Sequence, residues 1–540
     1  MDETQTPGPD QLLIRIDAVG LCFSDVKLVK QGGDHPKLYG RDLKIEPTRL
    51  GHEASVTVID VGSNLVGKYQ KGQRLAIQPD IHVDGKSTAY GYTIPGGLIQ
   101  YHLIGPEVLD ADDGAYVIPV SNEVGYAAAA LSEPWACVEA AYTQRRRLSP
   151  ATGGVMWIIG KPDDTTEYEF SSGLEAPSTI VVSDVSSRVR DLIARHNPTA
   201  EIVERNGLSA DGYETLAKEL TNGAGFDDIV VLDPRSASQM EEIAKLIAFR
   251  GTMNLVGTTP LDGKPQLDVG RLHYHYTAYV GTTGPDIAAA YGEARNRADL
   301  LPGGTTVFVG AGGPMGQMHM QRAIESENGP NIIIGSDLDD GRLDVARVML
   351  ADLAKERGKE LVLINSSTST ETLQELVMRM TDGNGADDVV VTVPVGPVMG
   401  EAAELMGKNG MLVLFAGVAN GTMAPLNLSN VYLHNAQLTG TSGSSIEDQA
   451  MVLQKAVEGK LSPDRSLAAV GGIEAGRDGV QAMLEGRFAG KIMIFPQLTG
   501  LPLTGLADLA KEHPDIGAAM APGHLWTDAA EDLLLEKFRS

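Results

Sequence analysis

The sequence TVFVGAGGPMGQMHM from Thr306 to Met320, followed by NIIIGSD from Asn331 to Asp337, decides the fold of this chain. A short apolar run ends in a glycine-rich loop, a helix-compatible segment follows, and a second apolar run ends at an acidic residue. This order of strand, glycine loop, helix, strand and acid is typical of a dinucleotide site in a doubly wound α/β unit. Glycines let the backbone approach a pyrophosphate, which the N–H groups at the helix N-terminus bind.

The loop reads G-x-G-x-x-x-G, one residue longer than the usual spacing, so a glycine-rich turn in an unrelated α/β sheet is the alternative. Asp337 lies about 20 residues after the last glycine, where a carboxylate binds the ribose hydroxyls. The same carboxylate repels a 2′-phosphate, which favours NAD and leaves NADP as the alternative. The predicted cofactor-binding residues here are Gly310, Gly312, Gly313, Pro314, Met315, Gly316 and Asp337.

Composition limits the function further. The chain has 540 residues, which predicts about three domains, and a net charge of −27, which argues against nucleic acid and anionic membranes as partners. Two cysteines exclude a disulfide framework and favour a reducing compartment. Residues 1–5 begin no secretory signal, and no apolar run approaches the ~18 residues of a membrane span. We therefore predict a cytoplasmic protein.

The first 150 residues contain short alternating strands at 12–18, 54–61 and 74–78, separated by glycine and proline, which predicts a small all-β unit. Three of its segments carry potential metal ligands: Cys22 in GLCFSD, His52 and Glu53 in LGHEA, and Glu133 in LSEPWACVEAAY. A thiolate, an imidazole and a carboxylate suit a catalytic Zn²⁺, which keeps one position open. Taken alone, the cysteine would be interpreted as a buried small apolar residue. The His-Glu pair alone would be interpreted as polar residues on the surface or at the end of a strand.

These segments, together with GGLIQYHLIGP at 96–106, resemble the zinc-dependent medium-chain dehydrogenase/reductase family, with the sorbitol dehydrogenase and sugar-phosphate reductase branches nearest. The resemblance implies a GroES-like β-barrel catalytic domain. It implies that Cys22, His52 and Glu133 bind zinc. It further implies that Glu53 ligates the ion directly or through water, and that Ser24 passes the substrate proton onward.

Two features of the sequence limit how far the metal sites of the family can be assigned to this chain. Many relatives carry a four-cysteine lobe for a structural zinc, which a chain with two cysteines cannot build, so one catalytic ion is expected. Cys137 lies one helical turn after Glu133 and competes with it as third ligand, although its small apolar neighbours favour a packing role. The resemblance also places Arg342 near the adenosine and Gly417 and Thr441 near the nicotinamide.

Residues 153–285 look like a degenerate copy of 303–444. TNGAGFDDIVVLDP at 221–234 agrees with TDGNGADDVVVTVP at 381–394 at 8 of 14 positions, which argues for internal duplication. The first copy has lost its loop glycines and carries four carboxylates in their place, so we predict that it binds no dinucleotide. We further predict that it covers the sheet edge at 438–440, as a subunit partner would.

The predicted order is therefore a GroES-like catalytic domain, a degenerate Rossmann-like repeat, an NAD-binding Rossmann domain, a return to the catalytic domain and a helical extension. The corresponding ranges are 1–150, 151–300, 301–445, 446–496 and 497–540. A monomer with an internal pseudo-dimer is expected, with a homodimer as the alternative. A lysine- and arginine-rich cluster is either a solvated loop or a docking site for a substrate phosphate; its members are Lys27, Lys30, Lys37, Arg41 and Lys44.

We predict a zinc-dependent oxidoreductase that transfers hydride between NAD(H) and a secondary alcohol of a polyol, sugar or sugar phosphate. The alternatives are a zinc-free NADPH-dependent quinone or enone reductase and a non-catalytic nucleotide-binding scaffold. Metal content and NADH binding together distinguish the three.

Overall fold

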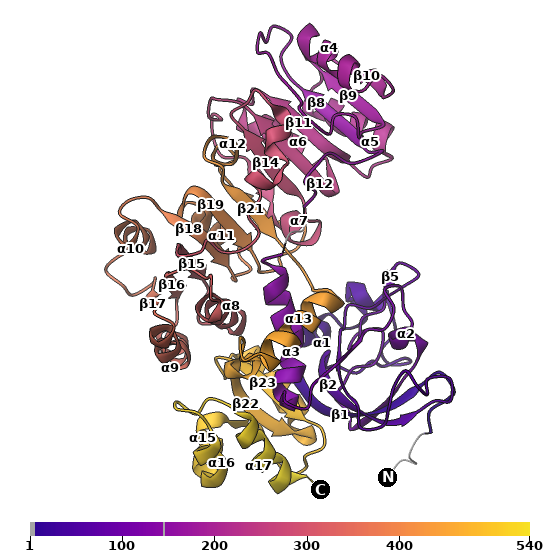
Figure 1. Ribbon diagram of the computed structural model, residues 1–540, viewed down its shortest axis with the longest axis vertical. Helices are drawn as coiled ribbons and strands as arrows, with labels where there is room; N and C mark the ends of the chain where they lie inside the picture. Colours follow the sequence, from indigo (N-terminus) through magenta and orange to yellow (C-terminus); the bar gives the residue numbers. More distant parts are fainter. Residues whose placement is uncertain (1–5, 144–145, 540) are drawn as a thin grey trace.

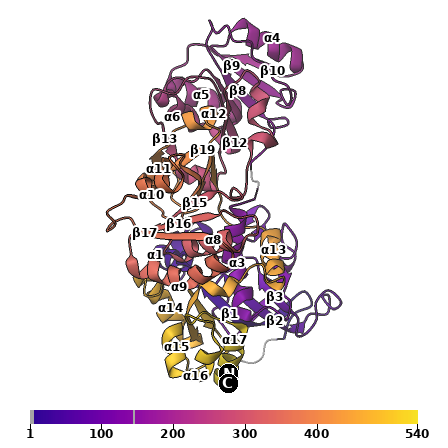
Figure 2. The same ribbon diagram turned by 60° about the vertical axis from the view of Figure 1, so that its left-hand side comes forward.

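The computed structural model describes residues 6–143 and 146–539 (Figure 1), so residues 1–5, which concern the predicted lack of a secretory signal, lie outside it. The molecule is elongated. A β domain and the C-terminal helices lie at one end, and a twelve-stranded sheet extends to the other (Figures 1 and 2). Within these residues, none of the helices combines the length and apolar character needed to cross a bilayer. The cytoplasmic location stays a prediction.

The β domain is built around an eight-stranded sheet of order β24-β22-β23-β1-β2-β3-β7, with β6 paired to β1. The strands predicted near residues 12, 54 and 74 are confirmed. Alternate residues of the first strand, among them Leu12, Ile14 and Ile16, are buried in the core of this domain. The strand bounds are β1 Leu12–Leu21, β2 Glu53–Val61, β3 Arg74–Ile77, β6 Tyr101–Ile104, β7 Val117–Pro119, β22 Leu467–Gly472, β23 Lys491–Phe495 and β24 Thr504–Gly505.

The C-terminal extension, predicted to be helical, contains helices and also a strand. It contains α15 (Leu506–Glu512), α16 (Pro514–Ala519) and α17 (Asp528–Phe538), and its β24 pairs with β22 in the catalytic sheet. Glu531 of α17 accepts hydrogen bonds from the first N–H groups of α3 (Tyr126–Ala140), including that of Ala127 at 2.9 Å. The apolar segments at 498–506 are too short to show the alternating pattern of a strand, so the sequence did not predict that the chain returns to the sheet there.

The twelve-stranded sheet consists of two six-stranded units with the same strand order, each parallel within itself. The units meet where β14 and β21 pair antiparallel through Tyr279 and Leu438. The first unit comprises β8 Val155–Ile159, β9 Thr179–Ser183, β10 Glu201–Glu204, β11 Phe226–Leu232, β12 Ile247–Val256 and β14 Ala278–Thr282. The second comprises β15 Thr305–Val309, β16 Ile332–Asp337, β17 Glu360–Asn365, β18 Ala386–Val391, β19 Met406–Leu414 and β21 Gln437–Gly440.

The two units also agree in local detail. Arg147 donates to the Asp227 carbonyl at 2.7 Å in the first unit, as Arg297 donates to the Asp387 carbonyl at 3.0 Å in the second. Each arginine also pairs with the buried aspartate that follows, Asp228 or Asp388. The predicted edge cover is therefore present: the first unit closes the β21 edge within the same chain.

Candidate active site

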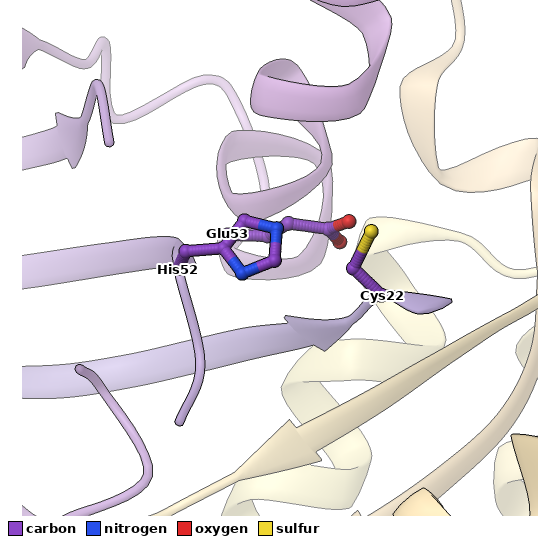
Figure 3. Close-up of side chains that lie close together, drawn as sticks. All are labelled: Cys22, His52 and Glu53. Atoms are coloured by element: carbon purple, nitrogen blue, oxygen red, sulfur yellow. The ribbon is translucent and has the colours of Figure 1, made fainter. Parts of the chain in front are cut away.

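The register of β1 and β2 brings two predicted ligands together. Gly20 pairs with Glu53 across the two strands, so Cys22, just after β1, lies beside His52, just before β2. The potential ligand atoms of Cys22, His52 and Glu53 all lie within 4.8 Å of one another. Figure 3 shows the sulfur, the ring and the carboxylate gathered in one place. His52 and Glu53 are buried and Cys22 is partly buried, so the cluster combines a soft thiol with a nitrogen and an oxygen, a donor set that suits Zn²⁺.

Asp25 orients this cluster, a role that the sequence reasoning missed although the residue stands in GLCFSD. Its buried carboxylate accepts hydrogen bonds from the N–H groups of Cys22 at 2.9 Å and Gly51 at 3.3 Å. Its Oδ1 lies 3.5 Å from His52 Nδ1, which leaves Nε2 as the ring nitrogen available to a metal. Burial raises the pKa of Asp25. The neighbouring His52 and the two N–H groups lower it by a larger amount, so the pKa of Asp25 lies below its ordinary value.

Lys491, at the start of β23, was also missed, since it lies far away in the sequence. Its ammonium donates to Glu53 Oε1 at 2.5 Å and to the Leu21 carbonyl at 3.0 Å, and both charged side chains are buried. The other oxygen, Glu53 Oε2, is buried without a hydrogen-bond partner among the described residues. A Cβ at position 20 would overlap this oxygen, so a larger residue there would require the Glu53 carboxylate to move. An unpartnered buried carboxylate oxygen beside a thiol and an imidazole fits a bound cation.

Glu133, on the buried face of α3, lies next to the cluster but outside the group defined by 4.8 Å. Its Oε1 is 3.9 Å from the Cys137 sulfur. Burial raises the pKa of Glu133 to about 7; His52 lowers it and Glu53 raises it. Both candidates for the remaining ligand therefore sit together, and the choice of Glu133 over Cys137 stays a prediction.

The Ser24 hydroxyl lies 3.5 Å from the Cys22 sulfur, close enough to the cluster for the predicted proton relay, which stays a prediction. Two of the five residues in the predicted basic cluster have acidic partners. Lys37 binds Asp80 at 2.8 Å and lies over the Tyr92 ring at 5.0 Å, whereas Arg41 faces Glu46 at 3.4 Å. Only Lys37 among the five predicted cations lines one of the cavities described below.

The glycine loop forms a cleft at the carboxyl end of the second unit's sheet. Gly310 has φ = 87°, and α8 (Pro314–Glu325) begins after Gly313. A Cβ at Gly316 would overlap the Gly310 carbonyl, so the helix can approach the loop closely only with glycine there. A cavity of about 1030 Å³ includes Gly310, Gly313, Asp337 and Arg342 in its lining. Asp337 Oδ2 also accepts a hydrogen bond from the Gly312 N–H at 2.8 Å.

Three other predicted cofactor residues, Met315, Gly417 and Thr441, are not part of the lining of that cavity. Met315, in the first turn of α8, packs against the apolar core. Gly417 adjoins Tyr274 of the first unit, where a Cβ would lie 2.5 Å from the tyrosine oxygen. Thr441 lines a second cavity, between the β domain and the two sheet units. The predicted roles of these residues toward the nicotinamide stay predictions.

Two regions of the chain match known protein families: residues 8–109 match the alcohol dehydrogenase GroES-like domain, and residues 314–458 match the zinc-binding dehydrogenase domain. These matches support a zinc-type medium-chain dehydrogenase. The first match contains Cys22, His52 and Glu53, and the second begins at Pro314, just after the glycine loop. In this family the α/β fold joins a GroES-like domain to a Rossmann-type domain, and the first sheet unit lies between the two matched regions.

Curated relatives agree with the family. The uncharacterized protein YggP of Escherichia coli is 24% identical, over 98% of this chain and 92% of its own. Mannitol-1-phosphate 5-dehydrogenase of Aliivibrio fischeri is 32% identical, over 44% of this chain and 57% of its own. The crystal structure of 2R,3R-butanediol dehydrogenase from Bacillus subtilis, 16% identical with a TM-score of 0.50, covers 92% of this chain and 95% of its own, and supports the fold alone. Together with the domain matches, these names support an oxidoreductase of the alcohol or polyol class.

Proposed function

We propose that the chain is a zinc- and NAD-dependent dehydrogenase that oxidises a secondary alcohol of a polyol or sugar phosphate. The observation that carries the proposal is the convergence of Cys22, His52 and Glu53 within 4.8 Å, with a buried carboxylate oxygen left unpartnered. Elemental analysis of the purified protein, combined with NADH titration and a panel of polyols and sugar phosphates, tests it. A protein that binds NADH but no zinc would contradict it.

The residues divide the work as follows. Cys22, His52 and a third ligand, Glu133 or Cys137, would hold the ion with Glu53 beside it, and Asp25 keeps the His52 ring in place through Nδ1. When bound, zinc supplies a Lewis acid that lowers the pKa of a coordinated hydroxyl. Ser24 would carry the released proton away from the Cys22 side. Lys491 neutralises Glu53 when that carboxylate is not shared with the ion. The cleft at Gly310 would hold the nucleotide that accepts hydride.

We expect Asp337→Ser to shift cofactor choice. The carboxylate lies in the cleft lining and would accept hydrogen bonds from the ribose hydroxyls, whereas it repels a 2′-phosphate. The ratio of kcat/KM with NAD to that with NADP should fall at least about 10-fold, the effect of one charge-assisted hydrogen bond. Asp340→Ser, an exposed α9 (Asp340–Glu356) residue outside the cleft lining, is the matched control. An unchanged ratio for the Asp337 variant would remove the NAD assignment.

We also propose that the two sheet units arose by duplication and that the first replaces a subunit partner. Their common strand order and the β14–β21 pairing support this proposal. In the first unit Lys161, directly after the loop position, pairs with Asp233, and Asp184 accepts hydrogen bonds from the Gly207 N–H. Both side chains are thus engaged within the protein, which supports the prediction that no dinucleotide binds there.

The edge pairing predicts a monomer, because the strand that would join two subunits is already occupied. Sedimentation equilibrium should give the chain mass of 57.2 kDa over a wide concentration range. A concentration-independent dimer would sink the subunit-mimic proposal and favour the homodimer.

A further inference from the structure

A cavity of about 780 Å³ lies where the β domain and both sheet units meet. The β domain contributes Lys37 and Asp80, the loop before α13 (Ile446–Val457) contributes Ser444, and the first sheet unit contributes Arg250 and Tyr276. The first unit, which lies outside both family matches, therefore forms part of this wall.

This cavity adjoins the candidate metal cluster. The Lys37 ammonium lies 5.0 Å from the centre of the Tyr92 ring, and that ring lies 5.8 Å from the His52 ring. On another side, the Ser444 hydroxyl lies 3.9 Å from the Cys137 sulfur. Single side chains, Tyr92 on one side and Cys137 on the other, therefore separate the wall of this cavity from the cluster.

Arg250 is the cation of this cavity that has no acidic partner. Lys37 is bound to Asp80 at 2.8 Å. Arg250, in contrast, forms no ion pair with any residue that the structure describes. Its guanidinium is exposed and lies over the Tyr276 ring at 4.9 Å, and Tyr276 is fixed by a 2.6 Å hydrogen bond to the Ser442 carbonyl. The aromatic ring positions the guanidinium without neutralising its charge.

The backbone at Arg250 is unusual for an arginine. Its φ is 57°, in the left-handed region, at a register shift of β12. The equivalent residue of the second unit is Asn409, with φ = 62°; the Arg250 N–H donates to the His275 carbonyl as the Asn409 N–H donates to that of His434, both at 2.8 Å. Asparagine is common in this conformation and arginine is not, so the side chain at position 250 is held at a backbone cost.

None of the three carboxylates that line the cavity forms an ion pair with Arg250 among the described residues. Asp80 is neutralised by Lys37, and Asp113 accepts a hydrogen bond from the Tyr116 hydroxyl at 2.8 Å. Glu447, in the first turn of α13, is the third carboxylate of the lining. A guanidinium presents paired N–H donors in the geometry of a phosphate or carboxylate, and in a chain of net charge −27 an exposed unpaired arginine is a specific place for an anion.

We propose that Arg250, supplied by the first sheet unit, binds the phosphate of a phosphorylated polyol whose alcohol lies at the Cys22–His52–Glu53 cluster. This inference rests on the proposed dehydrogenase function and names its substrate class. It gives the first unit a part in substrate recognition, and it transfers the predicted phosphate-docking role from the surface lysines to Arg250.

The test compares kcat/KM for mannitol 1-phosphate and for mannitol, with NAD, in the full-length zinc-loaded chain. Arg250→Asn removes the guanidinium and keeps a residue that tolerates the left-handed backbone. The ratio of the two kcat/KM values should fall at least about 10-fold, as expected for loss of a charged hydrogen bond. Arg250→Lys, which keeps the charge but loses the paired donors, should retain part of the preference.

Arg205→Asn is the matched control, since it removes the same charge from the first unit just after β10, outside the cavity, and should leave the ratio unchanged. Equal ratios for Arg250→Asn and the parent chain would overturn the inference. Calorimetric binding of mannitol 1-phosphate in the presence of NADH gives a readout independent of turnover. Binding that Arg250→Asn abolishes supports the inference even if neither compound is oxidised, whereas equal binding overturns it; absence of zinc or of turnover concerns the proposed function instead.

Discussion

Cys22→Ala is expected to lose its zinc and its dehydrogenase activity together. The thiolate is the softest donor of the cluster, and His52 and Glu53 alone leave an incomplete set for a tetrahedral ion. Activity should fall on the order of 10³-fold or more, since a bound Lewis acid contributes several kcal/mol to the reaction barrier. Elemental analysis and turnover should be measured on the same sample, with circular dichroism to verify folding. A variant that kept both properties would refute the metal site.

The same experiment on Cys137 identifies the third ligand. Cys137→Ala that keeps its zinc supports Glu133, and Glu133→Ala should then lose it. The reverse pattern would make Cys137 the ligand and leave Glu133 as a buried neighbour 3.9 Å away.

Arg322→Met is expected to lower the free energy of unfolding by a large amount. Arg322 of α8 is buried, donates to Glu139 at 3.0 Å and to Asp299 at 2.8 Å, and lies over the Tyr142 ring at 4.0 Å. It thereby joins the second sheet unit to α3. Burial lowers the pKa of Arg322, but the two carboxylates raise it more, so it stays charged. Removing one partner of a buried network costs about 3 kcal/mol, because Lys455 is then the one ionic partner of Glu139 among the described residues.

The loss should be measured as a change in the free energy of urea unfolding. Arg347→Met is the matched control: its partner, Asp344, stands three residues earlier on the exposed face of α9, and a surface pair of this kind contributes at most about 1 kcal/mol. If both variants unfolded alike, the Arg322 network would contribute nothing to the contact between α8 and α3.

The sequence predicted those parts of the site that depend on local pattern. The glycine loop, Asp337 and the pair at 52–53 stand next to strand ends, which the local sequence pattern locates. Asp25 was visible in its motif but had no assigned role, since its contact with His52 depends on the meeting of two loops. Lys491 and Arg250 could not be predicted, because they reach the site only through strand pairing and unit docking over hundreds of residues. The placement of Glu133 beside the cluster follows from how α3 crosses the barrel, which helical periodicity does not determine.

The antiparallel seam between β14 and β21 has a further consequence. In a symmetric homodimer, every substitution appears on both sides of the seam at once, so a residue that helps one side must be tolerated by the other. Here the two sides of the seam are encoded by different parts of one chain, so they are always present in equal amounts. Dilution cannot separate them, and neither side can be exchanged for a subunit of another protein. Under the proposed duplication, selection can act on each half independently, and the contrast between Arg250 and Asn409 at matching positions is the kind of divergence that this freedom permits.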